Sequence, residues 1–170
     1  MGALPNLILS QKEDFPFNGR NRRPPKDAVN AMLSLAYTLI ANDISAALET
    51  VGLDPYVGFF HSLRPGRASL ALDMMEEFRA YLGDRFVLSL INKRQISPKD
   101  FLHQGDNGVM LNENGRKTFI TAWQNRKRDI ITHPYLNEKI EIGLLPYVQS
   151  MMLARFIRKD IDDYPVFLIK

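Results

Sequence analysis

The sequence contains no cysteine in its 170 residues. This absence excludes disulfide bonds, zinc–thiolate centres and catalysis by a thiol. Long apolar runs are missing as well, and none approaches the roughly 20 residues that a membrane-spanning helix requires. The first residues also lack the positively charged start of a secretory signal. We therefore expect a protein without a membrane segment, and a reducing, cytoplasmic location suits this composition.

An excess of charge of one sign is also missing, because 22 basic residues face 19 acidic ones and the net charge is +3. Binding to nucleic acid therefore cannot rest on total charge, and the distribution of charge matters more. Basic residues gather in three places: Arg20, Arg22, Arg23 and Lys26; Arg126, Lys127 and Arg128; and Arg155, Arg158 and Lys159. Each cluster fits phosphate contacts, and each also fits a solvated surface or linker.

Strand-like alternation of apolar and polar residues is nearly absent, and there is no internal repeat. Apolar residues recur instead with the helical period, and helices are predicted to begin near Asp27, Ala68, Arg116 and Leu144. The length suits one domain with a sizeable core. We therefore predict an all-α fold. An N-terminal arm or linker, residues 1–26, carries the first basic cluster and precedes an α-helical domain, residues 27–170.

Short-range signals refine the first helix. Asp27 is a suitable N-cap, and Gly52 stands where a glycine often follows a helix end. Between Asp27 and Gly52, the adjacent residues Asn42 and Asp43 predict a break or a restart of the helix. Asn30 lies off the apolar stripe, which predicts an exposed side chain.

The second half of the chain contains a Gly- and Asn-rich stretch between two predicted helices. It predicts an exposed loop or a short hairpin around residues 109–111, with His103 facing solvent. The helix that follows is predicted from Lys117 to Ile131, with Trp123 and Ile130 on its buried side. His133 would then be a boundary residue just after this helix.

The last predicted helix covers about residues 144–158, where Pro146 is tolerable because it falls in the first turn. Its buried stripe is expected to include Phe156. The tail that follows, DDYPVFLIK, is apolar enough that we expect it to dock against the rest of the protein.

Residues 52–79, GLDPYVGFFHSLRPGRASLALDMMEEFR, combine a loop with a helix. Prolines and glycines predict irregular backbone around His61, where site residues often lie. The helical period then places Asp73 and Glu76 opposite an apolar stripe. Taken separately, these residues fit an ordinary loop and a solvated helix face. Taken together, one imidazole and one or two carboxylates fit a divalent metal, and the arginines nearby fit either an anionic substrate or ion pairs with the acids.

Three segments carry a resemblance to a known family: NGRNRRPPKDAVNAMLS, the stretch 52–79 quoted above, and LPYVQSMMLARFIR. They resemble the CRISPR-associated integrase family, which captures new spacers, and the similarity is closest to its type I-C subgroup. The resemblance covers the chain from about Leu9 to Lys170. It implies the helical catalytic domain of that family. The implied function is a metal-dependent DNA endonuclease and integrase, which cleaves phosphodiesters and transfers strands in spacer acquisition.

The same resemblance implies roles for particular residues. His61 matches the metal-binding histidine of the family and Glu76 its last acidic ligand, with Mn or Mg as the ion. Asp73 matches a nearby acidic position and would assist catalysis. Arginines would hold the DNA backbone without reading bases; they are Arg20, Arg22, Arg23, Arg64, Arg67 and Arg79. The expected partners are double-stranded DNA, a second copy of the chain and the small ferredoxin-like CRISPR-associated protein.

One motif of the family is not found in the sequence. The first metal ligand of the family is a Glu in a Glu-Gly-x-Ala type motif upstream of the QKEDF region, and no such motif occurs here. The β-rich N-terminal domain is not found either, so we expect the C-terminal part of such a protein. The alternative is a catalytically inactive helical module that binds DNA or protein. With one ligand missing, metal binding would be weak or absent.

Overall fold

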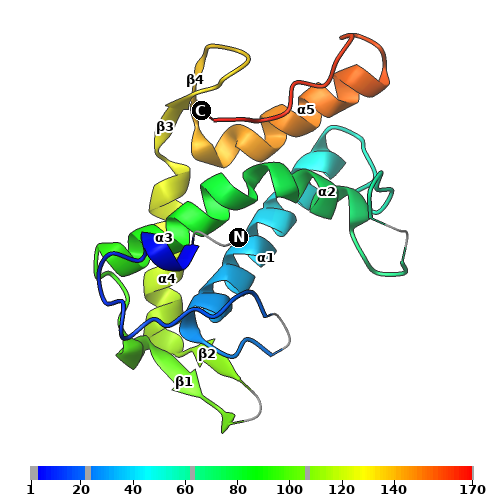
Figure 1. Ribbon diagram of the computed structural model, residues 1–170. Helices are drawn as coiled ribbons and strands as arrows, with labels where there is room; N and C mark the ends of the chain where they lie inside the picture. The colour runs from blue at the N-terminus through cyan, green and yellow to red at the C-terminus, as the bar shows by residue number, and fades with distance from the viewer. Residues whose placement is uncertain (1–3, 22–23, 62–63, 106–107, 170) are drawn as a thin grey trace. The chain divides into compact units, whose positions relative to one another are not determined.

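The structure is a computed structural model that describes residues 4–21, 24–61, 64–105 and 108–169. Helices dominate it, which confirms the predicted fold class (Figure 1). The main helices are α1 (Ala28–Thr50), α2 (Ser69–Phe78), α3 (Arg85–Asn92), α4 (Glu113–Lys127) and α5 (Leu145–Ile157). Short helical segments are η1 (Leu4–Leu7), the π-helical η2 (Arg79–Asp84), η3 (Pro98–Asp100) and η5 (Ile142–Leu144).

Two antiparallel hairpins accompany the helices in the described part of the chain. Strand β1 (Phe101–His103) pairs with β2 (Val109–Leu111), which confirms the hairpin predicted around residues 109–111. Strand β3 (Ile130–Thr132) pairs with β4 (Lys139–Glu141), which the sequence pattern did not indicate.

The chain forms two compact units. Unit 1 consists of Met1–Tyr37 with Tyr81–Asn125, and unit 2 of Thr38–Ala80 with Arg126–Lys170. The predicted boundary at residue 26 does not separate them. The described part of the arm contributes Ile8, Phe15 and Phe17 to the core of unit 1. The segment is therefore an integral part of unit 1.

Aromatic packing forms much of the core of unit 1. The Phe86 ring meets the rings of Phe119 and Trp123 edge to face, with both centroids 5.1 Å away. Phe15 meets Phe101 in the same manner at 5.9 Å. Edge-to-face contacts at these distances are favourable beyond the area that they bury. Trp123 is thus a core residue, as predicted.

The start of α1 is capped as predicted, but Asn30 is buried rather than exposed. Asp27 Oδ1 accepts the backbone N–H of Asn30 at 2.7 Å, as an N-cap does. The Asn30 side-chain amide donates to Asp27 Oδ2 at 2.7 Å and to the carbonyl oxygen of Gly19 at 2.9 Å. These partners offset the cost of burying the amide, and periodicity alone does not reveal them.

Helix α1 runs through Asn42 and Asp43, so the predicted break was wrong. Ile40 and Ile44 on either side are buried, and such packing overrides a weak local preference. Asp43 also pairs with Lys127 Nζ at 2.8 Å within unit 2. Gly52 adopts a φ of +81° just after the helix, as expected for its end. Contrary to the expectation from apolar runs, α1 is, among the described helices, long and apolar enough to cross a membrane by length and composition, and half of that stretch is buried inside the structure.

The segment after α4 differs from the prediction. The helix ends at Lys127, and the next residues pair as strands, with Ile130 opposite Glu141. Ile130 is therefore exposed rather than buried. His133 is fully buried, and both of its ring nitrogens have partners. Its Nδ1 accepts the backbone N–H groups of Tyr135 and Leu136, and its Nε2 lies 3.2 Å from Gln149 Oε1.

The C-terminal tail docks within unit 2, as predicted, and runs back along α5 (Figure 1). Phe167 is buried with its ring centroid 5.3 Å from that of Phe78. Glu77 on α2 accepts hydrogen bonds from the hydroxyl of Tyr164 (2.7 Å), the amide of Gln149 (2.9 Å) and the backbone N–H of Phe167 (3.0 Å).

Burial and the neighbouring Glu77 carboxylate raise the pKa of Tyr164 far above its usual range, so this hydroxyl remains a donor. One prediction for the last helix was wrong, because Phe156 is 39% exposed. It lies near the end of α5, where the helix gives way to the exposed turn at residues 158–160.

Candidate functional site

The site is built from the loop 53–61, which we call the His61 loop, and helix α2 that follows it in unit 2. The carbonyl oxygen of Pro55 accepts the backbone N–H groups of Leu70 and Ala71, at 2.9 and 3.3 Å. These are donors of the first turn of α2 that have no partner inside the helix. At Gly58, a Cβ atom would lie 2.7 Å from Ser69 Cβ. Only glycine therefore allows the loop to approach α2 this closely.

Asp73 holds the main chain of the His61 loop. Its Oδ2 accepts the backbone N–H of Phe59 at 2.6 Å and of Phe60 at 3.0 Å. Its Oδ1 accepts the backbone N–H of His61 at 3.1 Å and also bonds to the His61 ring nitrogen Nδ1. The Asp73 side chain is 4% exposed. A carboxylate that accepts four hydrogen bonds fixes both the path of the loop and the direction of the imidazole.

These contacts decide the charge of Asp73. Burial by itself raises the pKa of this carboxyl group, because it disfavours the charged form. The hydrogen bonds from the Phe60 N–H, the His61 ring and the Phe59 and His61 N–H groups outweigh burial and lower the pKa below its usual value. Asp73 is therefore an anion at neutral pH.

The anionic Asp73 also fixes the tautomer of His61. A carboxylate can only accept, so the neutral ring carries its proton on Nδ1 and leaves a lone pair on Nε2. The His61 side chain is 31% exposed, and no described residue hydrogen-bonds to its Nε2. Histidines that bind metals typically donate their other ring N–H to a carboxylate in this way.

Glu76 lies one helical turn after Asp73 on α2. Its carboxylate is half exposed and receives Arg79 Nη1 at 3.0 and 3.1 Å. No hydrogen bond joins it to the His61 ring within the described residues, and the approach of these two side chains stays a prediction. Within residues 4–21, 24–61, 64–105 and 108–169, no three His, Cys, Asp or Glu side chains are grouped so that they could hold a metal ion.

The donor chemistry nevertheless fits part of a metal site. His61 offers Nε2 in the correct tautomer, and Glu76 offers an accessible carboxylate. Carboxylates suit Mg²⁺ and Mn²⁺, while an imidazole favours a transition metal over Mg²⁺. His61 and Glu76 therefore fit two ligands of an ion such as Mn²⁺. Asp73 would not touch the ion, because both oxygens of Asp73 accept hydrogen bonds from the loop. Asp73 instead orients the histidine.

The predicted DNA-binding arginines lie in different settings. Arg20 is directed inward, where it bonds to Asn30 Oδ1 at 2.8 Å and to Ser34 Oγ at 3.0 Å. Arg64 is exposed and Arg67 half-buried. The remaining three are Arg79, which pairs with Glu76, and Arg22 and Arg23, which lie outside the described residues. Phosphate binding by these side chains stays a prediction.

Sequence reasoning missed two features of this site. It gave no role to Phe59 and Phe60, although two adjacent aromatic residues in a loop bounded by Pro and Gly are a recognisable signal. It also placed Asp73 on a solvated face, whereas the loop covers this side chain. The helical period predicts which face Asp73 lies on, but it contains no information about a loop that folds back onto that face.

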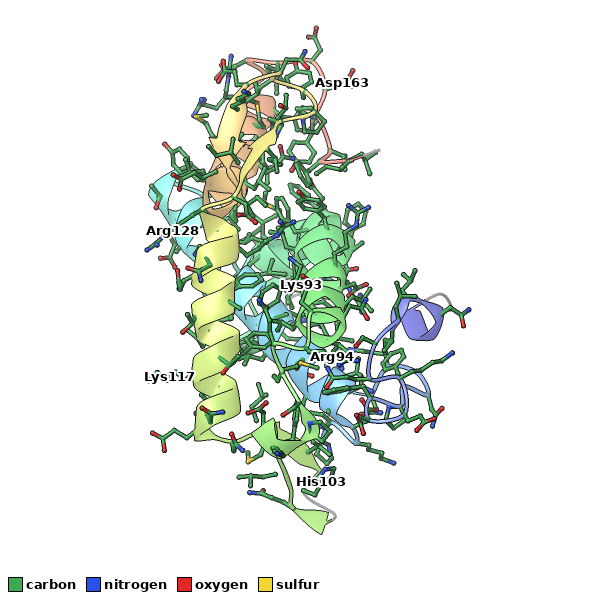
Figure 2. The ribbon with its side chains drawn as sticks, turned by 90° about the vertical axis from the view of Figure 1, so that its left-hand side faces the viewer. Lys93, Arg94, His103, Lys117, Arg128 and Asp163 are labelled. Atoms are coloured by element: carbon green, nitrogen blue, oxygen red, sulfur yellow. The ribbon has the colours of Figure 1, made fainter. Side chains whose placement is uncertain are left out.

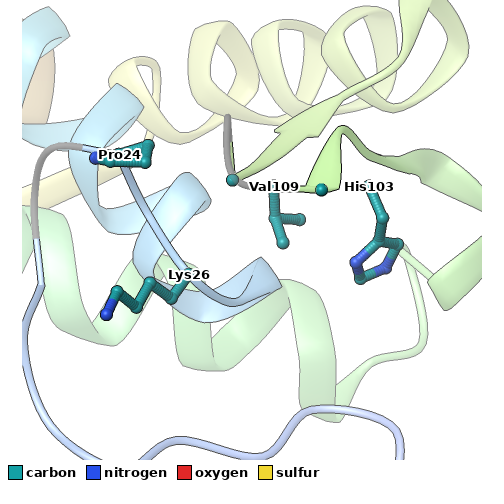
Figure 3. Close-up of a pocket in the computed structure, with 6 residues that line it drawn as sticks. Pro24, Lys26, His103 and Val109 are labelled. Carbon is teal, nitrogen blue, oxygen red and sulfur yellow. The ribbon is translucent and has the colours of Figure 1, made fainter.

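A pocket lies in unit 1, between the end of the N-terminal arm and the β1–β2 hairpin. Figure 3 shows Pro24 and Lys26 on one side and Val109 and His103 on the other. The hairpin is held there because Val109 N–H donates to the carbonyl oxygen of Pro25 at 2.8 Å. His103 is exposed in this hairpin, as predicted (Figure 2). The pocket contains none of the His61, Asp73 and Glu76 group.

Comparison with known proteins identifies the family of this helical protein, in which a helix carboxylate orients an accessible histidine. The chain matches the family described as CRISPR associated protein Cas1 over residues 2–125. It is 57% identical to CRISPR-associated endonuclease Cas1 1 of Chlorobaculum tepidum over 161 residues, which cover 95% of this chain and 47% of that protein. It is 52% identical to Cas1 2 of Rhodospirillum rubrum, over 99% of this chain and 49% of that protein. The chain belongs to the Cas1 family.

Solved structures agree with this family. A Cas1 protein from Thermotoga maritima superposes with a TM-score of 0.82 and 28% identity, over 94% of this chain and 50% of that one. A casposase bound to its integration product superposes with a TM-score of 0.80 and 25% identity, over 91% and 46%. The Cas1-containing chain of a Cas6-RT-Cas1–Cas2 complex superposes with a TM-score of 0.78 and 27% identity, over 93% of this chain and 17% of that one. The chain spans about half the length of the first relatives that it matches.

Proposed function

We propose that this chain contributes the histidine and an acidic ligand to a divalent-metal site that cleaves and joins DNA strands in CRISPR spacer acquisition. The observation that carries the proposal is the bond between Asp73 and His61 Nδ1, which leaves Nε2 accessible. The family supports the reaction, because its relatives include CRISPR-associated endonucleases. A casposase bound to an integration product has a similar fold, which supports strand transfer.

His61 and Glu76 would bind the ion, and Asp73 would keep the imidazole in the binding tautomer. A bound divalent ion polarises a phosphoryl oxygen and helps to orient the attacking and leaving oxygens. Arg79 holds Glu76 in place through its guanidinium and adds positive charge beside the phosphate position. Arg64 and Arg67 would hold the strand by contacts to phosphates, which carry no sequence information.

The proposed substrate is double-stranded DNA, and the proposed partners are a second copy of the chain and a Cas2 protein. A Cas1 protein is found with Cas2 in one of the similar structures, which supports this assembly. DNA binding that rests on phosphate contacts should be sequence-tolerant and strongly weakened by salt. The predicted phosphate contacts of Arg20, Arg22 and Arg23 belong to the same proposal.

Manganese titration of the chain tests the proposal directly, with bound Mn²⁺ followed by electron paramagnetic resonance. We expect saturable binding that weakens at least tenfold in His61→Ala and in Glu76→Gln. The matched control is Glu49→Gln, an exposed acid on α1 of the same unit. Equal Mn²⁺ affinity of the wild type, His61→Ala and Glu49→Gln would contradict the assignment of His61.

A second candidate is a catalytically inactive helical module that binds DNA or protein. It is favoured by the lack of a third metal-binding side chain beside His61 and Glu76 within the described residues. The two candidates differ in the metal requirement of strand cleavage. Cleavage of a labelled duplex that depends on Mn²⁺ and is lost in His61→Ala supports the enzyme, whereas DNA binding with no cleavage at saturating Mn²⁺ supports the module.

A further inference from the structure

The His61 loop exposes two consecutive phenylalanines immediately before the histidine. Phe59 and Phe60 are 66% and 91% exposed. Tyr56 and Val57 in the same loop are also exposed. Single exposed apolar residues are common, but several in one short segment typically mark a binding surface. The loop therefore presents an apolar surface directly beside the proposed metal ligand.

The main chain fixes this exposure. The N–H groups of Phe59 and Phe60 are both held by Asp73 Oδ2, at 2.6 and 3.0 Å. Gly58 lies so close to α2 that an added Cβ atom would be 2.7 Å from the same oxygen. The loop cannot turn its phenylalanines inward without giving up these contacts. The main chain that carries the two rings is therefore preorganised for a partner, which lowers the entropy cost of binding.

The charges nearby indicate which partner fits. Arg64 follows the pair by four residues and is exposed, and Arg67 is half-buried in the turn that its N–H makes with the Arg64 carbonyl oxygen at 3.0 Å. An apolar protein surface would have to desolvate these charges. A nucleotide instead offers a flat base to an aromatic ring and a phosphate to a guanidinium. The combination of rings and arginines therefore favours a nucleic acid.

A base inside a duplex stacks on its neighbours and pairs with its partner, whereas an unpaired base is free to stack on a protein ring. We propose that Phe59 and Phe60 form a stacking platform for an unpaired nucleotide of DNA and so position the strand end beside His61. The inference rests on the proposed function, because it takes DNA as the substrate and His61 as a metal ligand. In this role Phe60 is a positioning residue, since it would touch a base and not the reacting phosphate.

The test compares two labelled DNA hairpins that differ only in a short unpaired 3′ oligothymidine extension. Binding to the full chain is measured by fluorescence anisotropy in EDTA, at several salt concentrations. Phe60→Ala should weaken binding to the extended hairpin by about fivefold to a hundredfold, from the stacking energy of one base. Its affinity for the blunt hairpin should not change. The salt dependence should keep its slope, because no phosphate contact is lost.

Further variants separate stacking from general apolarity. Phe60→Trp should retain the preference for the extended hairpin, since it keeps a flat ring, and Phe60→Leu should lose it. The matched control is Leu9→Ala, an 82% exposed apolar residue in unit 1 that should change nothing. Far-UV circular dichroism verifies that each variant is folded. A 2-aminopurine in the extension, which loses fluorescence on stacking, should report the contact in the wild type and not in Phe60→Leu.

Several results would overturn the proposal. One is an equal affinity of the wild type for the two hairpins. Another is a loss of DNA affinity in Phe60→Ala that is the same for both hairpins. Unchanged DNA affinity together with altered sedimentation of Phe60→Ala would assign the pair to a protein interface instead. Because the assay contains EDTA, it does not depend on metal chemistry. Failure of the platform therefore appears in anisotropy, whereas failure of the proposed function appears in manganese titration and cleavage.

Discussion

Two buried aspartates, Asp100 in unit 1 and Asp73 in unit 2, hold the chain around them by the same chemistry. Asp100 accepts hydrogen bonds from the backbone N–H and the hydroxyl of Ser97, at 2.8 and 3.0 Å, and from the Asn114 amide at 2.9 Å. Burial by itself raises the pKa of Asp100, but these bonds outweigh it and lower the pKa below its usual value. Asp73 shows the same balance.

The two aspartates differ in what they hold. Asp100 closes a capping box at the start of η3 and ties it to the start of α4, so the polar groups that it binds are structural. Asp73 holds a loop that turns two phenylalanines and a histidine nitrogen toward solvent. Several hydrogen bonds and a lowered pKa therefore do not distinguish a structural carboxylate from one that supports a site. The exposure of the groups that it holds does.

The largest expected effect is that of Asp100→Ala on the stability of the protein. The variant should lower the free energy of unfolding by about 3 kcal/mol, because three donors lose their acceptor. Its Mn²⁺ affinity should equal that of the wild type. Urea denaturation measures the first quantity, and Glu113→Ala, an exposed acid at the start of α4, is the control. A loss of Mn²⁺ affinity in Asp100→Ala would show that the two aspartates are not separable.

A matched pair of glycines sharpens the comparison, because each lies against one of the aspartates. An added Cβ atom at Gly115 would be 2.4 Å from the Asp100 carbonyl oxygen, and one at Gly58 would be 2.7 Å from Asp73 Oδ2. We expect each alanine variant to lose about 2 kcal/mol of unfolding free energy through overpacking. Only Gly58→Ala should also weaken binding to the extended hairpin. Equal DNA binding by the two variants would argue against a role for the loop.

Asp73→Asn should lower the unfolding free energy less than Asp100→Ala does, but it should lower the Mn²⁺ affinity more. The amide keeps one acceptor oxygen but turns N–H groups toward the loop donors, so we expect a loss of about 1–2 kcal/mol in urea denaturation. Loss of the fixed tautomer of His61 should weaken Mn²⁺ binding about tenfold to a hundredfold. If Asp73→Asn is destabilised but binds Mn²⁺ as tightly as the wild type, Asp73 is structural, like Asp100.

The smallest expected effect is a change in the pH dependence of stability. The folded-state pKa of Asp100 lies below the unfolded value of 3.8, so its contribution is present above pH 3.8 and is lost as the pH falls through the folded-state pKa. The unfolding free energy of the wild type should therefore fall more steeply than that of Asp100→Asn below pH 3.8. Parallel curves for the two proteins would contradict the assigned shift.

Much of the helical framework could be predicted because its signals are local. The cap at Asp27, the positive φ at Gly52 and the first-turn Pro146 follow from the backbone chemistry of those residues. The predictions that failed concern polar residues whose partners are distant in sequence. Asn30 and His133 are buried because Gly19 and Gln149 satisfy them, and no periodicity encodes such pairs.

The candidate site was predicted in part for the same reason. Pro and Gly in the sequence predict irregular backbone around His61, and in the structure the imidazole bonds to Asp73. The different roles of the two carboxylates could not be predicted, because their helical spacing alone does not distinguish Asp73 from Glu76. The structure separates them, since the loop covers one and leaves the other half exposed.

The attachment of the C-terminal tail to Glu77 has a consequence for the direction of its neighbour, Glu76. Adjacent residues on a helix project about 100° apart, so fixing one side chain fixes the rotation of the helix about its own axis. Glu77 is bound by Tyr164 and Phe167, which lie 87 and 90 residues further along the chain. The C-terminal tail therefore helps to set the angle at which α2 presents its acidic residues. A premature stop codon before Tyr164 would keep His61 and Glu76 in the sequence but would remove two of the groups that hold Glu77.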